Sequence, residues 1–514
     1  MMSSFDAVSL EVFRRQLDGI AEEMGRTLIR SAYSPNIKER RDASSALFDP
    51  DGRLIAQAEH IPVHLGAMPD AVEAVIDAQS DPEATYLVND PYHGGSHLPD
   101  VTVVGAIFVA DTHVGYGAIR AHWADIGGPT PGGLAGGART IFEEGMRVPP
   151  TPIADGDQLR EAPIELLLSN VRNPRQRRAD LMAQLGALRV GNRRLESVVE
   201  THGIDRLLAA YDAVIDYSAR RTTDAIEAIQ NGTYHGIDYL EGDGFSNEPI
   251  PIELTVTVED DKIEVDFDGT ADQVPGNLNA PPAVAKSAVY FMLRCITDPD
   301  IPSNHGCYQS VDISIPAGSL LDPNPPAAVG GGNVETSQRI VDVLLDALRQ
   351  AVSSLPAHGQ GTMNNLIIGF DGEHTYYETI GGGAGATETA DGTDGVHVGM
   401  TNTRNTPIEA LERAYPVLVE RYGLRTGSGG RGRHRGGTGI ERTMRVEAPA
   451  TVSILSERRR LGPPGVAGGK PGRVGENRID GDPVGSKVTV RVEAGTQISI
   501  LTPGGGGYGA PSPE

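Results

Sequence analysis

The 514-residue chain carries a net charge of −25 with 39% hydrophobic residues, and it is too long for one small core, so we expect two or three domains. So acidic a surface disfavours nucleic acid as a partner. No apolar run of about 18 residues and no basic leader followed by an apolar run is present, which predicts no transmembrane helix, no signal peptide and a cytoplasmic location. The two cysteines, Cys295 and Cys307, are too few for a disulfide framework and fit a reduced compartment.

Lysine is scarce in this acidic chain. Lysine and arginine together number 44, of which the lysines are only Lys38, Lys262, Lys286, Lys470 and Lys487. An acidic, lysine-poor surface stays hydrated where salt screens its self-repulsion, which predicts a halophile with a saline cytoplasm. A GC-rich genome, which also favours arginine over lysine, is the alternative explanation.

The N-terminal third predicts one helix followed by strands. Apolar residues recur with helical spacing from Leu10 to Leu28 and predict an amphipathic helix over residues 5–33. Residues 45–128 alternate short apolar runs with turns. There the Asp-Gly of SALFDPDGRLIAQA predicts a hairpin, and VTVVGAIFVADTHVGYGAIRAHW predicts two strands around a turn.

The rest of the chain changes character twice. Residues 176–230 carry long helical patterns, and after Gly232 strands return, with one alternating pair joined at Asp260-Asp261. One more helix is predicted over about 335–354, and residues 360–514 are Gly-rich and strand-like. The whole indicates a multi-domain α+β protein with an N-terminal α+β region at 1–175, a helical segment at 176–235 and an α+β region at 236–514 that ends in Gly-rich β structure.

Two turn-rich segments place histidine beside aspartate. NDPYHGGSHLPD, residues 89–100, has His97 three residues before Asp100, and RAHWADIGG, residues 120–128, has His122 three residues before Asp125. Imidazole and carboxylate together suit Mn, Fe or Zn with open positions for substrate. Alternatively, the aspartates cap turns and the histidines have no special role. Spacing alone leaves both interpretations open, because a loop cluster is a looser pattern than H-E-x-x-H on a helix.

Three further side chains have a functional and a structural interpretation. His60 and His64, in EHIPVHLGAM, either line a pocket or serve packing and loop hydrogen bonding. Cys307 is either a nucleophile or, as is usual for a lone cysteine without a clear base, a small buried apolar group.

Gly-rich segments farther along the chain carry polar residues. Glu335 and Thr336 stand where GGG enters a predicted helix, a geometry that binds anions or simply caps the helix. No G-x-x-x-x-G-K-[ST] phosphate loop occurs, so any ATP is expected to bind elsewhere than on this chain. Four residues in later Gly-rich loops suit amide or phosphate recognition, although turn formation explains the asparagines equally well: Asn364, Asn365, Asn402 and Arg404.

Six segments, spread in order along nearly the whole chain, carry a family resemblance. They are NDPYHGGSHLPDVTVVGAIF, RAHWADIGG, GGGNVETSQRIVD, GTMNNLIIG, TNTRNTPIEALE and the terminal TPGGGGYG. Together they resemble the hydantoinase B/oxoprolinase family, from about residue 7 to residue 509. That family includes the B-type component of N-methylhydantoinase, the C-terminal half of 5-oxoprolinase and the α subunit of acetone carboxylase.

The resemblance implies a partner and a metal. The implied A-type partner has an ATP-binding fold and phosphorylates the substrate carbonyl, and in the carboxylase branch the B-type site holds manganese. Carried over by motif, the metal ligands are His97, Asp100 and His122, with Asp125 next. Two positions depart from the family pattern. Position 93 is His where Arg is common, and Trp123 stands where His is common, which puts the substrate in doubt.

The expected function is that of a B-type subunit of an ATP-dependent cyclic amidohydrolase that opens hydantoin or 5-oxoproline rings, with Mn here and ATP on the partner. Asp125 or Asp90 is expected as general base or as the partner that orients a ligand histidine. The residues expected to bind substrate are His64, Asn364, Asn365 and Arg404. The alternatives are an acetone carboxylase-like α subunit, whose site stabilises an enolate, and a non-catalytic subunit that only assembles with the partner.

Overall fold

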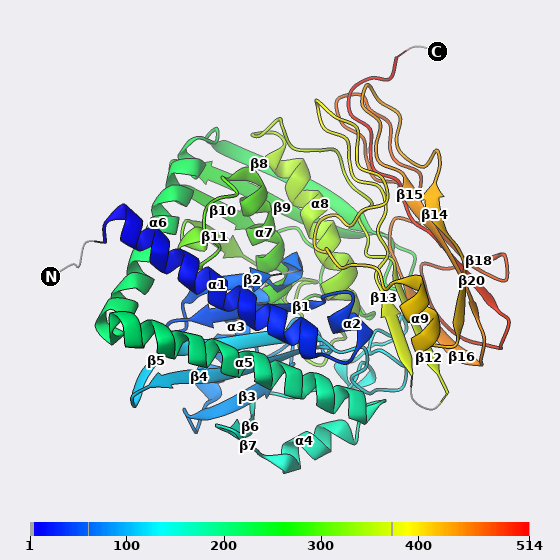
Figure 1. Cartoon of the computed structure of the whole chain (residues 1–514). Coiled ribbons are helices and arrows are strands. Elements are labelled where there is room, and N and C mark those ends of the chain that lie inside the picture. The colour runs from blue at the N-terminus through cyan, green and yellow to red at the C-terminus, as the bar shows by residue number, and fades with distance from the viewer. Residues whose placement is uncertain (1–4, 60, 372–373, 513–514) are drawn as a thin grey trace.

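The computed structural model describes residues 5–59, 61–371 and 374–512, and its N-terminal part is built on one antiparallel sheet (Figure 1). Within these residues, seven strands lie in the order β2-β1-β5-β4-β3-β6-β7. Their bounds are β1 (Ala43–Phe48), β2 (Leu54–Glu59), β3 (Ala84–Val88), β4 (Asp100–Val109), β5 (Thr112–His122), β6 (Thr151–Asp155) and β7 (Gln158–Leu159). β1–β2 and β4–β5 are the two predicted hairpins, which are thereby confirmed.

Helices cover both faces of this sheet. They are α1 (Ala7–Ser31), α2 (Pro35–Lys38), η1 (Pro62–His64), α3 (Ala67–Ala78), η2 (Ile141–Glu143), α4 (Glu161–Leu168), α5 (Pro174–His202) and α6 (Ile204–Glu227). α1 and α5 lie side by side across one face, and α3 packs on the other (Figure 1). α1 begins where the Asp6 carboxylate accepts the Ser9 N–H, and its buried face runs from Phe13 to Leu28, which confirms the predicted opening helix.

The central part holds a second sheet in the order β11-β10-β9-β8. Its elements are β8 (Gly232–Leu240), β9 (Ile250–Glu259), β10 (Lys262–Asp266), α7 (Pro282–Ile296), η3 (His305–Tyr308), β11 (Val311–Ser314), the π-helical turn η4 (Gly332–Thr336) and α8 (Ser337–Leu348). β9 and β10 meet at Asp260, whose φ of 51° forms the predicted tight turn. The helix predicted near residues 335–354 is α8, which packs on β8 and β9.

Two sheets form the C-terminal part, at the right of Figure 1, in the orders β13-β12-β16-β19 and β14-β15-β20-β17-β18. They share one apolar core. Their elements are β12 (Asn365–Phe370), β13 (Thr375–Glu378), α9 (Ile408–Ala414), β14 (Val417–Arg425), β15 (Gly439–Val446), β16 (Ala450–Leu455), β17 (Glu476–Ile479), β18 (Asp482–Val484), β19 (Lys487–Val492) and β20 (Gln497–Leu501).

Glycine lets extended segments pack backbone to backbone beyond these sheets. A Cβ on Gly383 would lie 2.0 Å from the Gly437 carbonyl oxygen, and one on Gly505 would lie 1.9 Å from that of Ala384. Hydrogen bonds between the segments, such as Gly505 N–H to Gly437 O at 2.9 Å, replace a regular ladder. The Gly-rich composition of this region therefore reflects close approach of chains.

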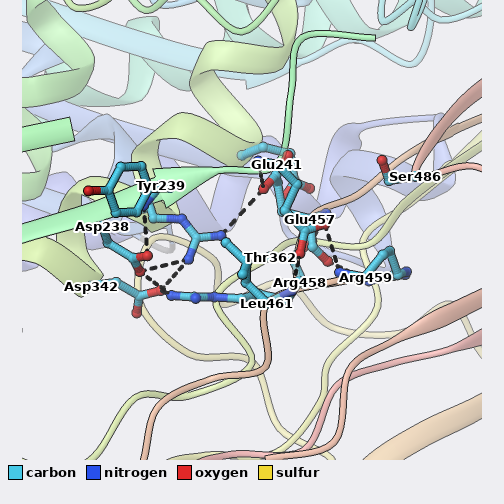
Figure 2. A network of polar contacts seen from close by, with 12 residues as sticks. Asp238, Tyr239, Glu241, Asp342, Thr362, Glu457, Arg458, Arg459, Leu461 and Ser486 are labelled. Carbon is cyan, nitrogen blue, oxygen red and sulfur yellow. Dashed lines mark hydrogen bonds and ion pairs between the residues drawn. The ribbon is translucent and has the colours of Figure 1, made fainter. Parts of the chain in front are cut away.

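Buried ion pairs connect the C-terminal part to α8 and β8 (Figure 2). Asp238 at the end of β8 pairs with Arg339 at 2.9 Å and with Arg458 at 2.5 Å, and Arg458 also pairs with Asp342 of α8. Arg339 and Arg458 are fully buried. These contacts hold the segment that follows β16 against α8.

The described residues share cores across the predicted domain boundaries. The boundaries near 175 and 235 fall beside the first residues of α5 and β8. Leu181 and Leu188 of α5 nevertheless belong to the same core as the N-terminal sheet, and Met68 of α3 belongs to the same core as Leu254 of β9. The division into three domains therefore stays a prediction. Within the described part of the chain, no helix is long and apolar enough to cross a membrane.

Candidate metal centre

The β4–β5 hairpin brings the two His/Asp segments together. Asp100 is the first residue of β4, His122 is the last of β5, and the antiparallel register places them opposite each other. His97 precedes β4 by three residues, in the turn that leads into it. The two motifs are separated in the sequence by the β4–β5 hairpin, whose two ends lie side by side.

Asp100 lies at the centre of the cluster. Its Oδ2 is 3.1 Å from His97 Nδ1, and its Oδ1 is 3.1 Å from His122 Nδ1. Each of the three residues offers one ligand atom, and these atoms lie within 4.8 Å of one another. All three side chains are buried. Two imidazoles and one carboxylate at this separation fit a divalent transition metal.

His64 joins the same carboxylate from the third side. Its Nε2 is 3.4 Å from Asp100 Oδ2, and its Nδ1 is 2.8 Å from the Ser44 hydroxyl. The Ser96 hydroxyl donates to Asp100 Oδ2 at 2.7 Å. Three imidazoles and a hydroxyl therefore surround one carboxylate in the interior.

Burial and neighbouring charges shift the pKa values of His97 and Asp100 in the directions that favour metal binding. Burial lowers the pKa of the His97 imidazole, against the pull of Asp100. Burial would raise the pKa of the Asp100 carboxyl, but His97, His64 and His122 outweigh it and hold that pKa well below its ordinary value. Neutral imidazole and ionised carboxylate are the ligand forms. In addition, His97 Nε2 is buried without a hydrogen-bond partner among the described residues, so this ring nitrogen is free to take a ligand.

A cavity of about 20 Å³ adjoins Asp100 and His122, large enough for a water molecule or an ion. Its walls come from three distant parts of the chain: the N-terminal sheet, the π-helical turn η4 and the C-terminal part. The lining residues are Asp42, Ile61, Val63, His64, Asp100, His122, Asn333, Val334, Met363, Tyr377, Thr379, Thr401 and Thr403.

Tyr377 fixes the outer face of His122. Their rings stack with centroids 4.6 Å apart and an angle of 19° between planes. The Tyr377 hydroxyl donates to Asn365 Oδ1 at 3.0 Å, and Arg40 donates to the Tyr377 carbonyl at 2.6 Å. Such contacts behind a metal-binding histidine set its orientation.

The chain resembles known proteins over nearly its whole length. The family model described as hydantoinase B/oxoprolinase matches residues 6–511. The chain belongs to the hydantoinase B/oxoprolinase family. It is 42% identical to 5-oxoprolinase 1 of Arabidopsis thaliana, over 98% of this chain and 42% of that protein. The chain thus spans less than half the length of that relative.

Two further relatives of this family match nearly end to end. A Pseudomonas sp. protein, provisionally named as the B-type component of a D-/L-hydantoinase, is 30% identical over 99% of this chain and 91% of its own length. The crystal structure of ATP-dependent caprolactamase from Pseudomonas jessenii superposes with a TM-score of 0.92 at 30% identity, covering 99% of this chain and 92% of that one. Oxoproline, hydantoin and caprolactam are all cyclic amides.

The two expected catalytic aspartates of this family member lie in turns and do not line the cavity. Asp125 accepts N–H groups of Gly127, Gly132 and Arg172, and it pairs with the Arg172 guanidinium at 3.0 Å. Asp90 accepts the Tyr92 N–H and pairs with His93 at 2.7 Å. Both carboxylates are therefore engaged by their surroundings.

The expected substrate-binding residues divide into two groups. His64 lines the cavity, whereas the other three do not. Asn364 is buried and bonded to Gln360 and Arg459. The Asn365 amide donates to the Glu335 carboxyl and the Leu455 carbonyl, and it accepts from the Tyr377 hydroxyl. Arg404 is exposed, and its N–H donates to the Arg40 carbonyl just outside the cavity wall.

Three further residues singled out in the sequence are buried and hydrogen-bonded within the fold. Burial raises the pKa of the Cys307 thiol, which donates to the Pro302 carbonyl at 2.9 Å. Trp123 is fully buried and donates to Gln184 at 3.1 Å. Thr336 donates to the Leu278 carbonyl. His60 lies outside the described residues.

Glu335 is a buried acid within the π-helical turn. Its Oε1 accepts from Asn365 Nδ2 at 2.8 Å and from the Met363 N–H at 3.2 Å. Its Oε2 has no hydrogen-bond partner among the described residues. Burial raises the pKa of this carboxyl to about 8. Glu335 thus stands behind Asn365 and Tyr377, with a proton at neutral pH.

Sequence reasoning missed most of the cavity-lining residues, among them Asp42, Asn333 and Tyr377. Asp42 directly precedes β1, and Tyr377 lies in β13, so neither belongs to a motif that marks a site. Asn333 had a usable indication, because it stands inside GGGNVETSQRIVD, where attention fell on Glu335 and Thr336.

Proposed function

We propose that this chain is the B-type subunit of an ATP-dependent cyclic amidohydrolase. An A-type partner phosphorylates the carbonyl oxygen of a hydantoin- or 5-oxoproline-type ring, and this chain opens the activated ring. The observation that carries the proposal is the buried His97–Asp100–His122 cluster beside a cavity, in a chain whose relatives are named for cyclic amides.

His97, Asp100 and His122 would hold the metal, which we assign as Mn. His64 contacts the Asp100 carboxylate beside them. A divalent ion there would supply Lewis acidity at neutral pH. The donor set of two imidazoles and one carboxylate supports a divalent transition metal at this place, as does the unpartnered Nε2 of His97, and the choice of Mn rests on the family resemblance.

The chemistry begins from a poor electrophile. An unactivated amide carbonyl resists attack, and a phosphoryl group turns its oxygen into a leaving group. One water then adds at the ring carbon, and the ring C–N bond breaks to give an amine and an acyl phosphate. A second water hydrolyses the acyl phosphate to a carboxylate and free phosphate. Asp42 is the carboxylate that lines the cavity beside Asp100, so we assign it the proton from the attacking water. Asp90 holds the turn that precedes β4, and Asp125 holds the loop that follows β5.

Substrate entry requires the cavity to widen, because its present volume suits a water or an ion rather than a ring. Residues 401–407, which carry Thr401 and Thr403 of the wall, have no regular secondary structure. We assign this segment the opening movement, with Arg404 at its outer side to attract an anionic substrate.

The test is co-expression with the neighbouring A-type protein, followed by ATP turnover against 5-oxoproline, hydantoins, caprolactam and ketones. The complex is expected to hydrolyse ATP only with a cyclic amide present, and this chain alone is expected to show no ATP turnover. His122→Ala should abolish ring opening, whereas His235→Ala, an exposed histidine of β8, should not.

Three results would contradict the proposal. Robust ATP hydrolysis by this chain alone would refute the division of labour between subunits. Bicarbonate-dependent turnover of ketones without turnover of cyclic amides would assign the chain to the carboxylase alternative. Full activity of the complex with His122→Ala would leave only the assembly role.

A further inference from the structure

Asn333 lines the cavity and has an unused hydrogen-bond acceptor. The residue stands in the cavity wall together with Asp100 and His122 and is 3% exposed. Its Oδ1 is buried and has no hydrogen-bond partner among the described residues. Buried polar atoms are almost always paired in native proteins, so an orphan at a ligand cavity indicates a missing ligand group.

Several other polar side chains at the cavity already have partners. Arg40 donates to the hydroxyls of Thr379 and Thr403 at 2.6 and 3.1 Å. Tyr377 donates to Asn365, and His64 pairs with the Ser44 hydroxyl. Among the described residues that line this cavity, the Asn333 oxygen is the buried polar atom left without one.

The backbone that carries Asn333 is tightly held. It lies in the π-helical turn η4, a form that is frequent at functional sites. A Cβ on Gly332 would lie 1.9 Å from the Asn279 carbonyl oxygen, and the Asn333 carbonyl accepts the Ser337 hydroxyl at 2.7 Å. The wall on this side is therefore fixed, in contrast to residues 401–407 on the other side.

We infer that Asn333 is the specificity-determining residue of the site and that its Oδ1 accepts a hydrogen bond from the ring N–H of a cyclic amide. An acceptor fixed at this place selects rings that carry an N–H donor over ketones and lactones, which have none. The inference rests on the proposed function and narrows its substrate class.

The test compares rings that differ at one position. Binding to the full complex with its A-type partner, without ATP, is measured by calorimetry for a five-membered lactam and for the cyclic ketone in which CH2 replaces N–H. Wild type is expected to bind the lactam about 10- to 100-fold more tightly, the range of one buried hydrogen bond with a neutral donor. Asn333→Ala is expected to bind both rings equally.

Three controls make the result interpretable. Asn333→Asp keeps an acceptor at the same place and should retain the preference for the lactam. Asn231→Ala, an exposed asparagine before β8, should behave as wild type. Metal content should be the same in all of these variants, which shows that the ligand cluster is intact.

Two outcomes would count against the inference and are distinguishable. If wild type opens lactams and Asn333→Ala keeps the full preference for the N–H ring, the role of Asn333 is refuted and the proposed function stands. If the wild-type complex neither binds nor opens any cyclic amide, the proposed function fails, and the inference fails with it.

Discussion

Glu335 is connected to His122 through two intervening side chains. Its carboxyl holds Asn365, Asn365 holds the Tyr377 hydroxyl, and the Tyr377 ring lies on His122. Burial raises the pKa of this carboxyl to about 8, with Glu457 acting in the same direction and Lys487 and Arg459 opposing it. Because the group is protonated when folded and ionised when unfolded, it makes the stability depend on pH.

Glu335→Gln should remove this dependence. An unfolded glutamate ionises near pH 4.5 and the folded one near 8, so the free energy of unfolding of wild type falls between these values, by at most about 5 kcal/mol. The variant keeps the acceptor for Asn365 and does not titrate, so its advantage over wild type should grow from pH 5 to pH 8 in denaturant unfolding. Glu264→Gln, exposed on β10, is the control. A difference that does not change with pH would contradict the protonated state.

Tyr377 allows its ring and its hydroxyl to be tested separately. Tyr377→Phe keeps the stack on His122 and should retain metal, but it leaves Asn365 Oδ1 unpaired at a cost of about 1–3 kcal/mol in stability. Tyr377→Leu removes the stack and should lower metal affinity about 10- to 100-fold, measured by chelator competition. Equal affinity in the two variants would mean that the ring does not orient His122.

Among single residues, the sequence predicted the members of the buried cluster better than the cavity walls. His97, Asp100 and His122 stand in two short motifs that suit a metal or a capped turn equally, the family resemblance favours the metal, and one hairpin closes the distance between the motifs. Tyr377 and Asn333 reach the cavity only through pairing of segments more than 200 residues from His122. No local pattern encodes such contacts, so Tyr377 was missed, and for Asn333 its place in GGGNVETSQRIVD was the one usable indication.

Among the elements, α8 and the chain after β16 are fixed to each other by buried charges (Figure 2). Arg458→Met would leave Asp238 and Asp342 with one arginine fewer in a buried site, which should cost about 3–5 kcal/mol in unfolding free energy. Arg491→Met, which removes an exposed pair with Asp371, should cost about 0–1 kcal/mol. Urea unfolding of both variants makes the comparison, and equal losses would show that burial of the network does not matter.

Local sequence patterns predicted the positions of helices and hairpins well, but they did not predict a π-helical turn. The 3.6-residue period placed α1 within two residues of its ends, and the Asp-Gly and Asp-Asp turns located two hairpins. The helix predicted from 335 begins at Ser337, because its first turn is π-helical and buried against the Asn277–Ala280 segment. Apolar period does not distinguish such a turn from a helix. The order of the strands in the C-terminal sheets depends on long-range pairing and was beyond the sequence.

For the whole molecule, the charge of −25 predicts that salt stabilises the fold. Repulsion between like charges reaches about 30 Å at 0.01 M salt and only about 3 Å at 1 M. Thermal melts in KCl should therefore show a melting temperature that rises toward molar concentration. A flat or falling melting temperature would favour the GC-rich-genome explanation for the scarcity of lysine and would leave the family assignment unchanged.

We expect His97, Asp100 and His122 to form a metal site, and elemental analysis of purified protein tests this. We predict about one transition metal ion per chain, chiefly Mn, in wild type and in His235→Ala, because His235 is exposed on β8 and does not belong to the cluster. His97→Ala and His122→Ala should each lose the metal, since the remaining ligands cannot replace the missing bond. Equal metal content in wild type and all three variants would contradict the account.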